Sequence, residues 1–265
     1  MKDLLDAYTR GELSVEEVQE RLMRMLYEGG EVFLLDLHRT ARIGFPEVIF
    51  AEGKTIEQVI AIAKGLFEKN GHVFVSVIDE EKEIHIKHQF ARAEVKKAGR
   101  LLLIKRHGFA SRKIPGRIGI ITAGTADVPF AQESALILEE LGFDLIRAFD
   151  MGASGMHRPL LGLKKAKGSD VLIVFAGMDG VLPTLMASLT ELPIIAVPTP
   201  IGYGHGGLGE AALATMLQCC VPGVMVMNIG NSVGAAAAAV RILKTFQRKA
   251  AGEAQIDLDP LGNKV

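Results

Sequence analysis

Residues 171–183 read VLIVFAGMDGVLP, an apolar run that ends in a glycine-rich turn with one acidic residue. The same plan recurs after residue 116, where helical stretches alternate with apolar strand candidates at Ile118–Thr122, Leu145–Phe149, Val171–Phe175, Ile194–Val197 and Val224–Asn228. Strands that are apolar throughout are typical of a parallel sheet covered by helices on both faces. The pattern therefore predicts a three-layer α/β/α sandwich with a central parallel sheet.

The sequence before residue 116 follows a less regular pattern, which predicts a smaller α+β domain. Helices are expected from about residue 14 to 27, after a capping box at Ser14 and Glu17, and from Thr55 to Gly71. Strand candidates are Val32–Leu37, Leu101–Lys105, and a hairpin formed by His72–Ile78 and Glu83–Lys87. Because Pro115-Gly116 is a turn signal, we place the domains at 1–115 and 116–250, followed by a polar tail at 251–265.

Composition narrows the classes of function. The 265 residues carry 30 Lys+Arg and 31 Asp+Glu, and 49% are hydrophobic. This near balance favours a small-molecule partner over nucleic acid. No apolar run approaches the length of a membrane span or a secretory signal, so we expect no membrane partner. The two cysteines, Cys219 and Cys220, are adjacent and cannot form a disulfide framework, which points to a reducing, cytoplasmic location.

Two turns that follow predicted strands carry acidic residues. Ligands of such sheets bind beyond the carboxyl ends of the strands. Gly124-Thr125-Ala126-Asp127 leads into a predicted helix, so its amides could hold a phosphate and Asp127 could accept hydrogen bonds from ribose hydroxyls. Asp179 lies between glycines at another helix start, where it could act as a general acid or base. For both residues, helix capping is the competing interpretation.

Two further loops could bind anions. The segment from Asp150 contains two glycines and the pair His157-Arg158, which could recognise phosphate or carboxylate or could be an exposed basic turn. Residues 202–207 satisfy the pattern G-x-G-x-x-G, with Gly204, His205, Gly206 and Gly207 as candidate contacts. We reject a dinucleotide fingerprint, because the next strand candidate ends in Asn and Gly without the carboxylate that holds a ribose. An anion-binding loop of another kind remains open.

The adjacent cysteines are placed at the end of a helix that begins near Glu210. Free cysteines are usually inert, buried hydrophobic residues, whereas a nucleophilic cysteine needs partial exposure and a positive environment. The residues alone leave both interpretations open. The alanine run at 235–239 suits a helix that packs closely in the core or at a subunit contact.

Taken in order, these motifs resemble one family. Gly-Thr-Ala-Asp, Gly-Met-His-Arg, Ala-Gly-Met-Asp-Gly, the Gly-Tyr-Gly loop and Cys220-Val-Pro-Gly are similar to LarB, a family of nickel-pincer nucleotide biosynthesis. The segment from Asp36 to Val48 (DLHRTARIGFPEV) also resembles LarB. The carboxyl-terminal half is similar to class I PurE, the aminoimidazole ribonucleotide (AIR) carboxylase/mutase of purine synthesis, which implies a PurE/flavodoxin-like sheet.

The resemblance implies a carboxylase and hydrolase. Its substrate would be nicotinic acid adenine dinucleotide, and CO2 or bicarbonate and water would be co-substrates. The products would be pyridinium-3,5-biscarboxylic acid mononucleotide and AMP. The resemblance assigns the nucleophile to Cys220, because the family commonly has serine at the position of Cys219, and it assigns the proton-removing base to Asp179.

The resemblance also implies roles for the loops and for an ion. Asp127 would hold ribose hydroxyls, and His157, Arg158 and the amides of residues 204–207 would surround phosphate or carboxylate. Magnesium would assist hydrolysis of the anhydride, although the sequence does not identify its ligands. A homo-octamer with sites at subunit contacts is expected, and Arg39 and Arg42 of the amino-terminal domain would grip the adenylate end.

Two positions depart from the family pattern. Asp179 stands where the family has glutamate, and Gly230 stands where it has aspartate. These departures leave open a catalytically silent nucleotide-binding module. The PurE-like fold separately leaves open an AIR carboxylase or mutase of purine synthesis. Turnover separates the silent module from both enzymes, and substrate choice separates the enzymes from each other.

Overall fold

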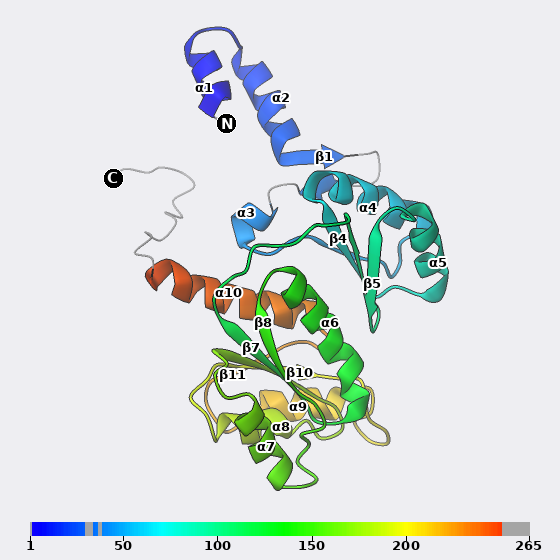
Figure 1. Ribbon diagram of the computed structural model, residues 1–265, viewed down its shortest axis with the longest axis vertical. Helices are drawn as coiled ribbons and strands as arrows, with labels where there is room; N and C mark the ends of the chain where they lie inside the picture. The colour runs from blue at the N-terminus through cyan, green and yellow to red at the C-terminus, as the bar shows by residue number, and fades with distance from the viewer. Residues whose placement is uncertain (1, 30–33, 37–38, 251–265) are drawn as a thin grey trace. The chain divides into compact units, whose positions relative to one another are not determined.

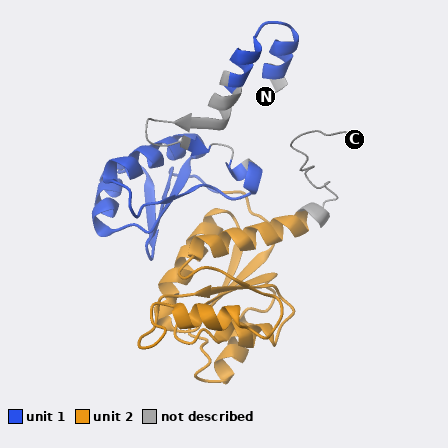
Figure 2. Cartoon of the chain, turned by 180° about the vertical axis from the view of Figure 1, so that it is seen from behind, with its two compact units in different colours: residues 1–110 blue, residues 111–265 orange. Residues whose placement is uncertain are grey.

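The chain forms two compact units. The computed structural model describes residues 2–29, 34–36 and 39–250 (Figure 1). Unit 1 comprises residues 1–110 and unit 2 comprises residues 111–265 (Figure 2). The turn at Pro115-Gly116, where the sequence placed the boundary, lies just inside unit 2. The predicted polar tail at 251–265 lies outside the described residues.

Unit 2 is built on a five-stranded parallel sheet, as the sequence predicts. The sheet has the order β11-β10-β9-β7-β8, and every neighbouring pair is parallel. Its strands are β7 (Arg117–Thr122), β8 (Asp144–Ala148), β9 (Val171–Ala176), β10 (Ile194–Pro198) and β11 (Val224–Val226). Every residue of the central strand β9 is buried. A strand with both faces buried gains from being apolar at each position, which explains the run that begins at Val171.

Helices cover both faces of this sheet, which confirms the three-layer sandwich (Figure 1). One layer contains α6 (Val128–Glu140) and α10 (Ser232–Ala250), which pack against each other and against the sheet. The other contains α7 (His157–Lys165), α8 (Leu182–Ala187) and α9 (Glu210–Leu217). Ala235, Ala236 and Ala239 of α10 are fully buried, so the alanine run lets the helix approach the sheet closely.

The strand order determines where a ligand can enter. From β7 the chain runs through α6 to the edge strand β8, and then returns through α7 to β9 on the other side of β7. The connections after β7 and β9 therefore leave the sheet in opposite directions. The space beyond their carboxyl ends is the topological switch point, where doubly wound sheets bind ligands.

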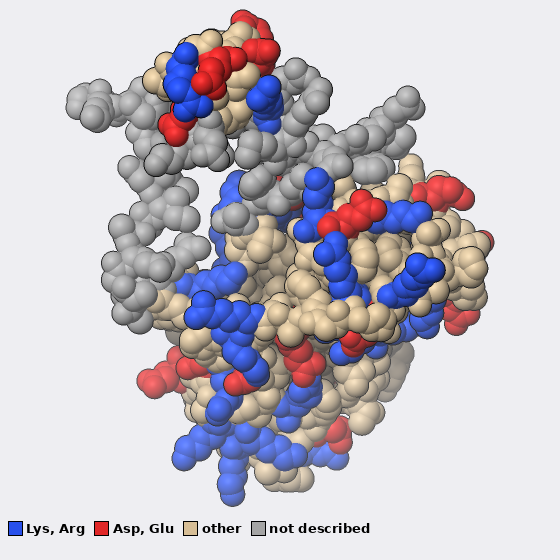
Figure 3. Space-filling view, turned by 45° about the horizontal axis from the view of Figure 1, so that its top comes forward, with Lys and Arg blue, Asp and Glu red and all other residues tan. Residues whose placement is uncertain are grey.

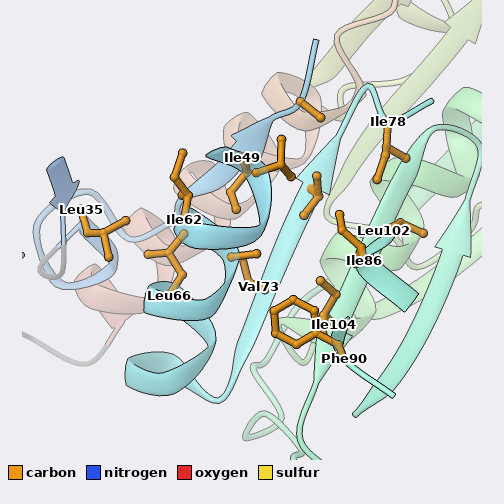
Figure 4. Packing of buried hydrophobic residues seen from close by; sticks show 14 residues of the cluster. Leu35, Ile49, Ile62, Leu66, Val73, Ile78, Ile86, Phe90, Leu102 and Ile104 are labelled. Atoms are coloured by element: carbon orange, nitrogen blue, oxygen red, sulfur yellow. The ribbon is translucent and has the colours of Figure 1, made fainter. Parts of the chain in front are cut away.

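Unit 1 has a smaller mixed sheet with the order β3-β4-β6-β5. Its strands are β3 (Val48–Phe50), β4 (His72–Ser76), β5 (Glu94–Ala98) and β6 (Leu101–Lys105), and only the pair β3–β4 is parallel. Helices α4 (Ile56–Asn70) and α5 (Glu80–Gln89) pack on this sheet through a buried aliphatic cluster that includes Ile62, Leu66, Val73, Ile86 and Ile104 (Figure 4).

The remaining elements of unit 1 lie near its amino end. They are α1 (Lys2–Thr9), α2 (Val15–Leu26), β1 (Tyr27–Gly29), β2 (Leu34–Asp36) and α3 (Arg39–Ile43). β1 and β2 pair in the antiparallel sense. The predicted strand at 32–37 therefore overlaps β2, while residues 32, 33 and 37 of that prediction lie outside the described residues.

Helix α4 begins and ends where its sequence signals predict. The Thr55 side chain accepts from the Gln58 amide, and the Gln58 side chain accepts from the Thr55 amide. Gly71 has a φ of 76° and donates its N–H to the carbonyl of Phe67. Glycine adopts this left-handed conformation without steric cost, so the helix ends at Asn70.

The predicted hairpin at 72–87 is wrong in its second half, which forms α5. Ile84 and Ile86 alternate with polar residues as in a strand, but Ile86 is 0% exposed and Ile84 is 67% exposed. The Asp79 side chain accepts from the Lys82 amide at 2.8 Å, which begins the helix. β6 pairs with β4 on one side and with β5 on the other. The sequence of β5, EVKKA, is rich in charged residues and carries little strand signal.

Acidic and basic side chains occur together on the face shown in Figure 3. In the described part of the chain, no helix combines the length and the apolarity that crossing a membrane requires.

Burial of His72 makes the stability of unit 1 sensitive to acid. The ring lies 5.6 Å from Phe74 and 4.7 Å from Phe109 between centroids, and its Nδ1 is buried without a hydrogen-bond partner. Burial, with a smaller contribution from the Lys105 ammonium, lowers the pKa of His72 from 6.5 to about 4. Unfolding therefore takes up a proton between these pH values, and stability falls as the pH falls from 6.5 to 4.

We expect the His72→Phe variant to lose this part of the pH dependence. Its unfolding free energy, measured by urea titration, should depend less on pH than that of the wild type by about 2–3 kcal/mol between pH 6.5 and 4. The carboxylates of the chain respond to acid in both proteins and cancel in the comparison. Parallel pH profiles for the two proteins would refute this assignment.

Candidate functional site

A pocket of about 690 Å³ opens at the carboxyl ends of the unit 2 strands. The connections after β7, β8 and β9 line it, together with helix α8 and Ile201 from the connection after β10. The lining residues include Gly124, Asp127, Gly152, Ser154, Gly177, Met178, Asp179 and Leu185. The sequence motifs that follow separate strands therefore converge at the switch point.

Asp127 joins three of these connections from within the protein. Its side chain accepts from the Gly124 amide at 2.8 Å and from the Thr199 hydroxyl at 2.5 Å, and the Gly177 amide also donates to it. Asp127 is only 3% exposed, and burial raises the pKa of its carboxyl group against the opposing effect of these donors. The side chain does not cap α6, because its hydrogen bonds go elsewhere.

The bond from Thr199 to Asp127 should contribute measurably to stability. We expect Thr199→Val to lower the unfolding free energy by about 1.5–3 kcal/mol, because a buried carboxylate loses a hydrogen-bond donor. Thr245→Val is the matched control, since the exposed Thr245 hydroxyl bonds only within its own helix, and its effect should stay below about 0.5 kcal/mol. Equal urea midpoints for the two variants would contradict the structural role of the bond.

Asp179 presents an exposed carboxylate to the pocket. Its Oδ1 lies 3.4 Å from the amide of Val181, which is long for a hydrogen bond, and α8 has no side-chain cap. This single long hydrogen bond at the start of the helix leaves both the capping and the catalytic interpretation of Asp179 open. Its carboxylate remains available to accept a proton from a ligand.

Close backbone packing fixes the loop that carries Asp179. A Cβ atom at Gly177 would lie 2.4 Å from the carbonyl oxygen of Ile201, and one at Gly180 would lie 2.7 Å from the Ala212 backbone. Met178 has a φ of 51°, a conformation that is uncommon for a residue with a side chain. The two glycines are thus required for steric reasons, and they position the acidic residue between them.

The loop after β8 reaches the pocket through Gly152, Ala153 and Ser154, and His157 and Arg158 lie outside the lining. Arg158 Nη1 is 3.2 Å from Asp150 Oδ1, so its charge is partly balanced. His157 is exposed at the start of α7.

Other predicted contacts also lie outside the lining of this pocket. Thr125 does not line it, although its neighbours Gly124 and Ala126 do. Gly204, His205, Gly206 and Gly207 form an irregular stretch ahead of α9, and Ile201 is the residue of this connection that reaches the pocket. The structure therefore brings together Gly124, Asp127 and Asp179 from the predicted set.

The two cysteines differ in environment. Helix α9 ends at Leu217, three residues before Cys220, where the sequence predicted its end, and both cysteines follow it in an irregular segment. Cys220 is exposed, so the interpretation as an inert buried residue does not hold for it. Cys219 is half-buried, and its Sγ accepts from the Thr184 hydroxyl at 3.2 Å.

Thr184 connects the cysteine segment to the border of the pocket. It lies on α8 beside Leu185, which lines the pocket. Cys219 and Cys220 are not themselves part of the lining. Thr184 and Thr199 were not found from the sequence, because an isolated threonine carries no signal for a contact that is distant along the chain.

The charge of the pocket bears on how it could hold an anion or a metal. Its lining contains the carboxylates of Asp127 and Asp179 and no cationic side chain. Among the described residues, no three His, Cys, Asp or Glu side chains cluster in a way that could hold a metal ion. Anion binding by the lining itself would rely on backbone N–H groups.

Unit 1 contains a second group of predicted contacts. Arg42, on α3, forms a two-point ion pair with Asp36. The Nε of Arg39 and Oε2 of Glu47 are buried, and neither has a hydrogen-bond partner. Unsatisfied buried polar atoms are uncommon in folded proteins and call for an explanation. The Nε of Arg39 is therefore an unsatisfied buried donor, whereas the Arg42 guanidinium group is already paired with Asp36.

Comparison with known families accounts for both units. Residues 27–106 match the LarB/PurE-like N-terminal domain, and residues 117–256 match the AIR carboxylase domain. An uncharacterized protein of Methanocaldococcus jannaschii is 37% identical over 258 residues, covering 94% of this chain and 98% of that protein.

Relatives that are named as enzymes match unit 2. The N5-carboxyaminoimidazole ribonucleotide mutase of Pyrococcus horikoshii is 33% identical over 128 residues, 48% of this chain and 71% of that enzyme. The mutase of the same name from Methanocaldococcus jannaschii is 35% identical over 124 residues, 46% of this chain and 73% of that enzyme.

Proposed function

Because the chain belongs to the LarB family, with a PurE-like AIR carboxylase domain after a LarB-type amino-terminal domain, we propose that it carboxylates nicotinic acid adenine dinucleotide and hydrolyses its phosphoanhydride. The products are pyridinium-3,5-biscarboxylic acid mononucleotide and AMP. The observation that carries the proposal is the occurrence of both domains in one chain, with an exposed cysteine in the PurE-like domain.

A nucleophile is needed because the pyridinium ring is electron-poor and cannot attack CO2. When the Cys220 thiolate adds to a ring carbon, aromaticity is lost and another ring carbon gains enamine character. That carbon attacks CO2 and forms the new carbon–carbon bond. Exposure of Cys220 supports this role, because a sulfur sealed in the core could not reach a ring.

The adduct must then lose a proton so that the thiolate can leave. Asp179 is the base in this proposal, because its carboxylate is exposed, borders the pocket and lacks a close internal donor. Removal of the proton from the newly carboxylated carbon restores aromaticity and expels the Cys220 thiolate.

Hydrolysis of the anhydride requires stabilisation of phosphate charge. Magnesium is commonly held by substrate phosphates with one or two carboxylates and water, so it needs no preformed cluster of protein ligands. The described residues fit only such a substrate-held ion, to which the protein would contribute little more than a carboxylate at the pocket. Bound magnesium would stabilise the negative charge on the phosphate oxygens during hydrolysis of the anhydride.

We further propose that this reaction takes place in a homo-octamer with sites at subunit contacts. The substrate carries negative phosphate and carboxylate groups, but the pocket lining has no cationic side chain to bind them. This supports a site to which a neighbouring subunit contributes positively charged side chains. Exposed apolar residues on or beside the unit 2 helices, among them Met156, Leu160 and Leu217, are suited to burial between subunits.

The proposal is tested by mixing the purified full-length protein with nicotinic acid adenine dinucleotide, bicarbonate and magnesium. Mass spectrometry should detect AMP and the dicarboxylated mononucleotide in equal amounts. If neither compound forms above the level without protein, the proposed activity is wrong.

The second candidate is a mutase or carboxylase that acts on aminoimidazole ribonucleotides. Similarity of unit 2 to the mutases of Pyrococcus horikoshii and Methanocaldococcus jannaschii favours it. The two reactions are distinguished by substrate and by the effect of thiol alkylation. Turnover of N5-carboxyaminoimidazole ribonucleotide that survives alkylation of Cys220 would favour the mutase.

Unit 1 is proposed to bind the adenylate end of the substrate through Arg39. We expect Arg39→Ala to weaken AMP binding about tenfold, the loss of roughly one charge-assisted hydrogen bond. Arg42→Ala should have a smaller effect, because Asp36 already neutralises that guanidinium group. Isothermal titration with AMP measures both, and an unchanged affinity in Arg39→Ala would reject this role.

A further inference from the structure

Two adjacent thiols follow helix α9, and the proposed reaction uses only one of them. Cys220 is exposed, whereas Cys219 is half-buried. The Cys219 sulfur is held by the Thr184 hydroxyl, which donates to it at 3.2 Å, and it donates to the carbonyl oxygen of Val221 at 3.4 Å. The Cys220 sulfur is therefore accessible to small oxidants, and Cys219 is the residue next to it in the sequence.

We propose that Cys219-Cys220 is a redox modification site, at which peroxide oxidises Cys220 and Cys219 then closes a disulfide between the two neighbouring residues. In the first step, the Cys220 thiolate attacks a peroxide oxygen, forms a sulfenic acid and releases water after protonation. In the second, the Cys219 thiolate displaces the sulfenic hydroxyl group, which leaves as water. Two thiols and one hydrogen peroxide give one disulfide and two water molecules.

The position of the pair gives the backbone room to adjust. Helix α9 ends at Leu217 and β11 begins at Val224, so both cysteines lie in a segment outside regular secondary structure. Gly223, near the end of this segment, has a φ of 96°, a conformation that marks a sharp turn. The ring can therefore close without breaking a helix or a strand.

Thr184 positions the sulfur that acts in the second step, because its hydroxyl donates to Cys219 Sγ at 3.2 Å. Because Thr184 lies on α8, which packs against the sheet, it holds the Cys219 sulfur in place while Cys220 is oxidised.

The disulfide should be easy to reduce. Consecutive Cα atoms are about 3.8 Å apart, whereas disulfides usually join Cα atoms about 4.4–6.8 Å apart. A strained disulfide has a less negative reduction potential and is reopened by cellular thiols. The modification is thus reversible, and it prevents further oxidation of Cys220 to sulfinic acid.

The effect on catalysis rests on the proposed function, whereas formation of the bond does not. If Cys220 is the nucleophile, the disulfide removes the attacking thiolate and stops carboxylation until it is reduced. A serine at position 219, as the resemblance implies for other family members, could not form this bond.

The test treats full-length wild-type protein and the Cys219→Ser variant with a small excess of hydrogen peroxide at neutral pH. Peptide mass spectrometry should show the wild-type peptide containing both cysteines lighter by two hydrogen atoms, and dithiothreitol should restore its mass. In Cys219→Ser, the peptide should instead gain two or three oxygen atoms at Cys220, and dithiothreitol should not reverse this change. If the wild-type peptide gains oxygen at the same rate as the variant and never loses hydrogen, the proposal is overturned.

A carboxylation assay of the Cys220→Ser variant, read beside the oxidised wild-type sample, separates the two hypotheses. Disulfide formation combined with full carboxylation by Cys220→Ser would leave the modification site intact and refute the proposed nucleophile. Loss of carboxylation in Cys220→Ser, without a disulfide in the oxidised wild type, would refute the modification site alone.

Discussion

Cys220→Ser should abolish carboxylation of nicotinic acid adenine dinucleotide, with a loss of at least about 10³-fold in kcat. The serine hydroxyl is a far weaker nucleophile at neutral pH, so the pyridinium ring stays aromatic and its carbon cannot attack CO2. Because Cys220 is exposed, the substitution should leave folding unchanged. Chromatographic quantification of the dicarboxylated product measures the effect.

Cys219→Ser is the matched control for this substitution. It changes the neighbouring sulfur, which bonds to Thr184, and should retain carboxylation within about tenfold of the wild type because the nucleophile is kept. Equal losses in the two variants would point to a structural role for the segment and would argue against the thiolate mechanism.

Substitution of Asp179 is expected to have the second large effect on kcat. We expect Asp179→Asn to lower kcat by about 10²–10⁴-fold, because an amide cannot take the proton that must leave before aromaticity returns. Substrate affinity should change much less, since the shape of the side chain is preserved. Steady-state kinetics separate the two parameters.

Asp179→Glu tests whether the shorter side chain limits this protein. Glutamate extends the carboxylate by about 1.5 Å, one carbon–carbon bond. A large gain in rate would show that the wild type is a weakened enzyme. Asp144→Asn is the control and should leave kcat unchanged, because Asp144 lies at the amino end of β8 and the pocket opens at the carboxyl ends of the strands. If Asp179→Asn is as active as the wild type, another group is the base.

At Gly230, the second departure from the family pattern, the fold has room for the aspartate of the other members. Gly230 has a φ of 66°, and a Cβ atom there would meet only ordinary contacts, the nearest being the Phe130 ring at 3.5 Å. Aspartate tolerates this region of φ better than most residues. The carboxylate that other members carry could therefore be introduced at this position without a clash.

The parallel sheet of unit 2 could be predicted because its strands are buried on both faces. An apolar run such as Val171–Phe175 would be unfavourable in a strand with one face exposed to solvent. Because the strands are parallel, the turns that follow them lie together at the carboxyl ends of the sheet. In unit 1, the alternation of Ile84 and Ile86 favours a strand, but only Ile86 is buried and Asp79 begins a helix. The charged strand β5 is stabilised by pairing with β6, which local sequence does not reveal.

The candidate site could be predicted from the sequence only where the backbone geometry requires a particular residue type. The turn at Gly177–Gly180 must contain glycines because neighbouring backbone lies too close for a side chain, so the sequence marks it clearly. The partners of Asp127 could not be foreseen, because Thr199 is distant in sequence and becomes a neighbour only when β10 joins the sheet. Arg158 and Asp150 are close in sequence, but local sequence did not indicate that they pair with each other outside the pocket lining.

One measurement tests the central claim most directly. Native protein and the Cys220→Ser variant are incubated with nicotinic acid adenine dinucleotide, magnesium and isotopically labelled bicarbonate, and the nucleotide products are weighed by mass spectrometry. The account predicts one labelled carboxyl group on the pyridinium mononucleotide from the native protein and none from the variant. Labelled product from both proteins at equal rates, or from neither, would contradict it.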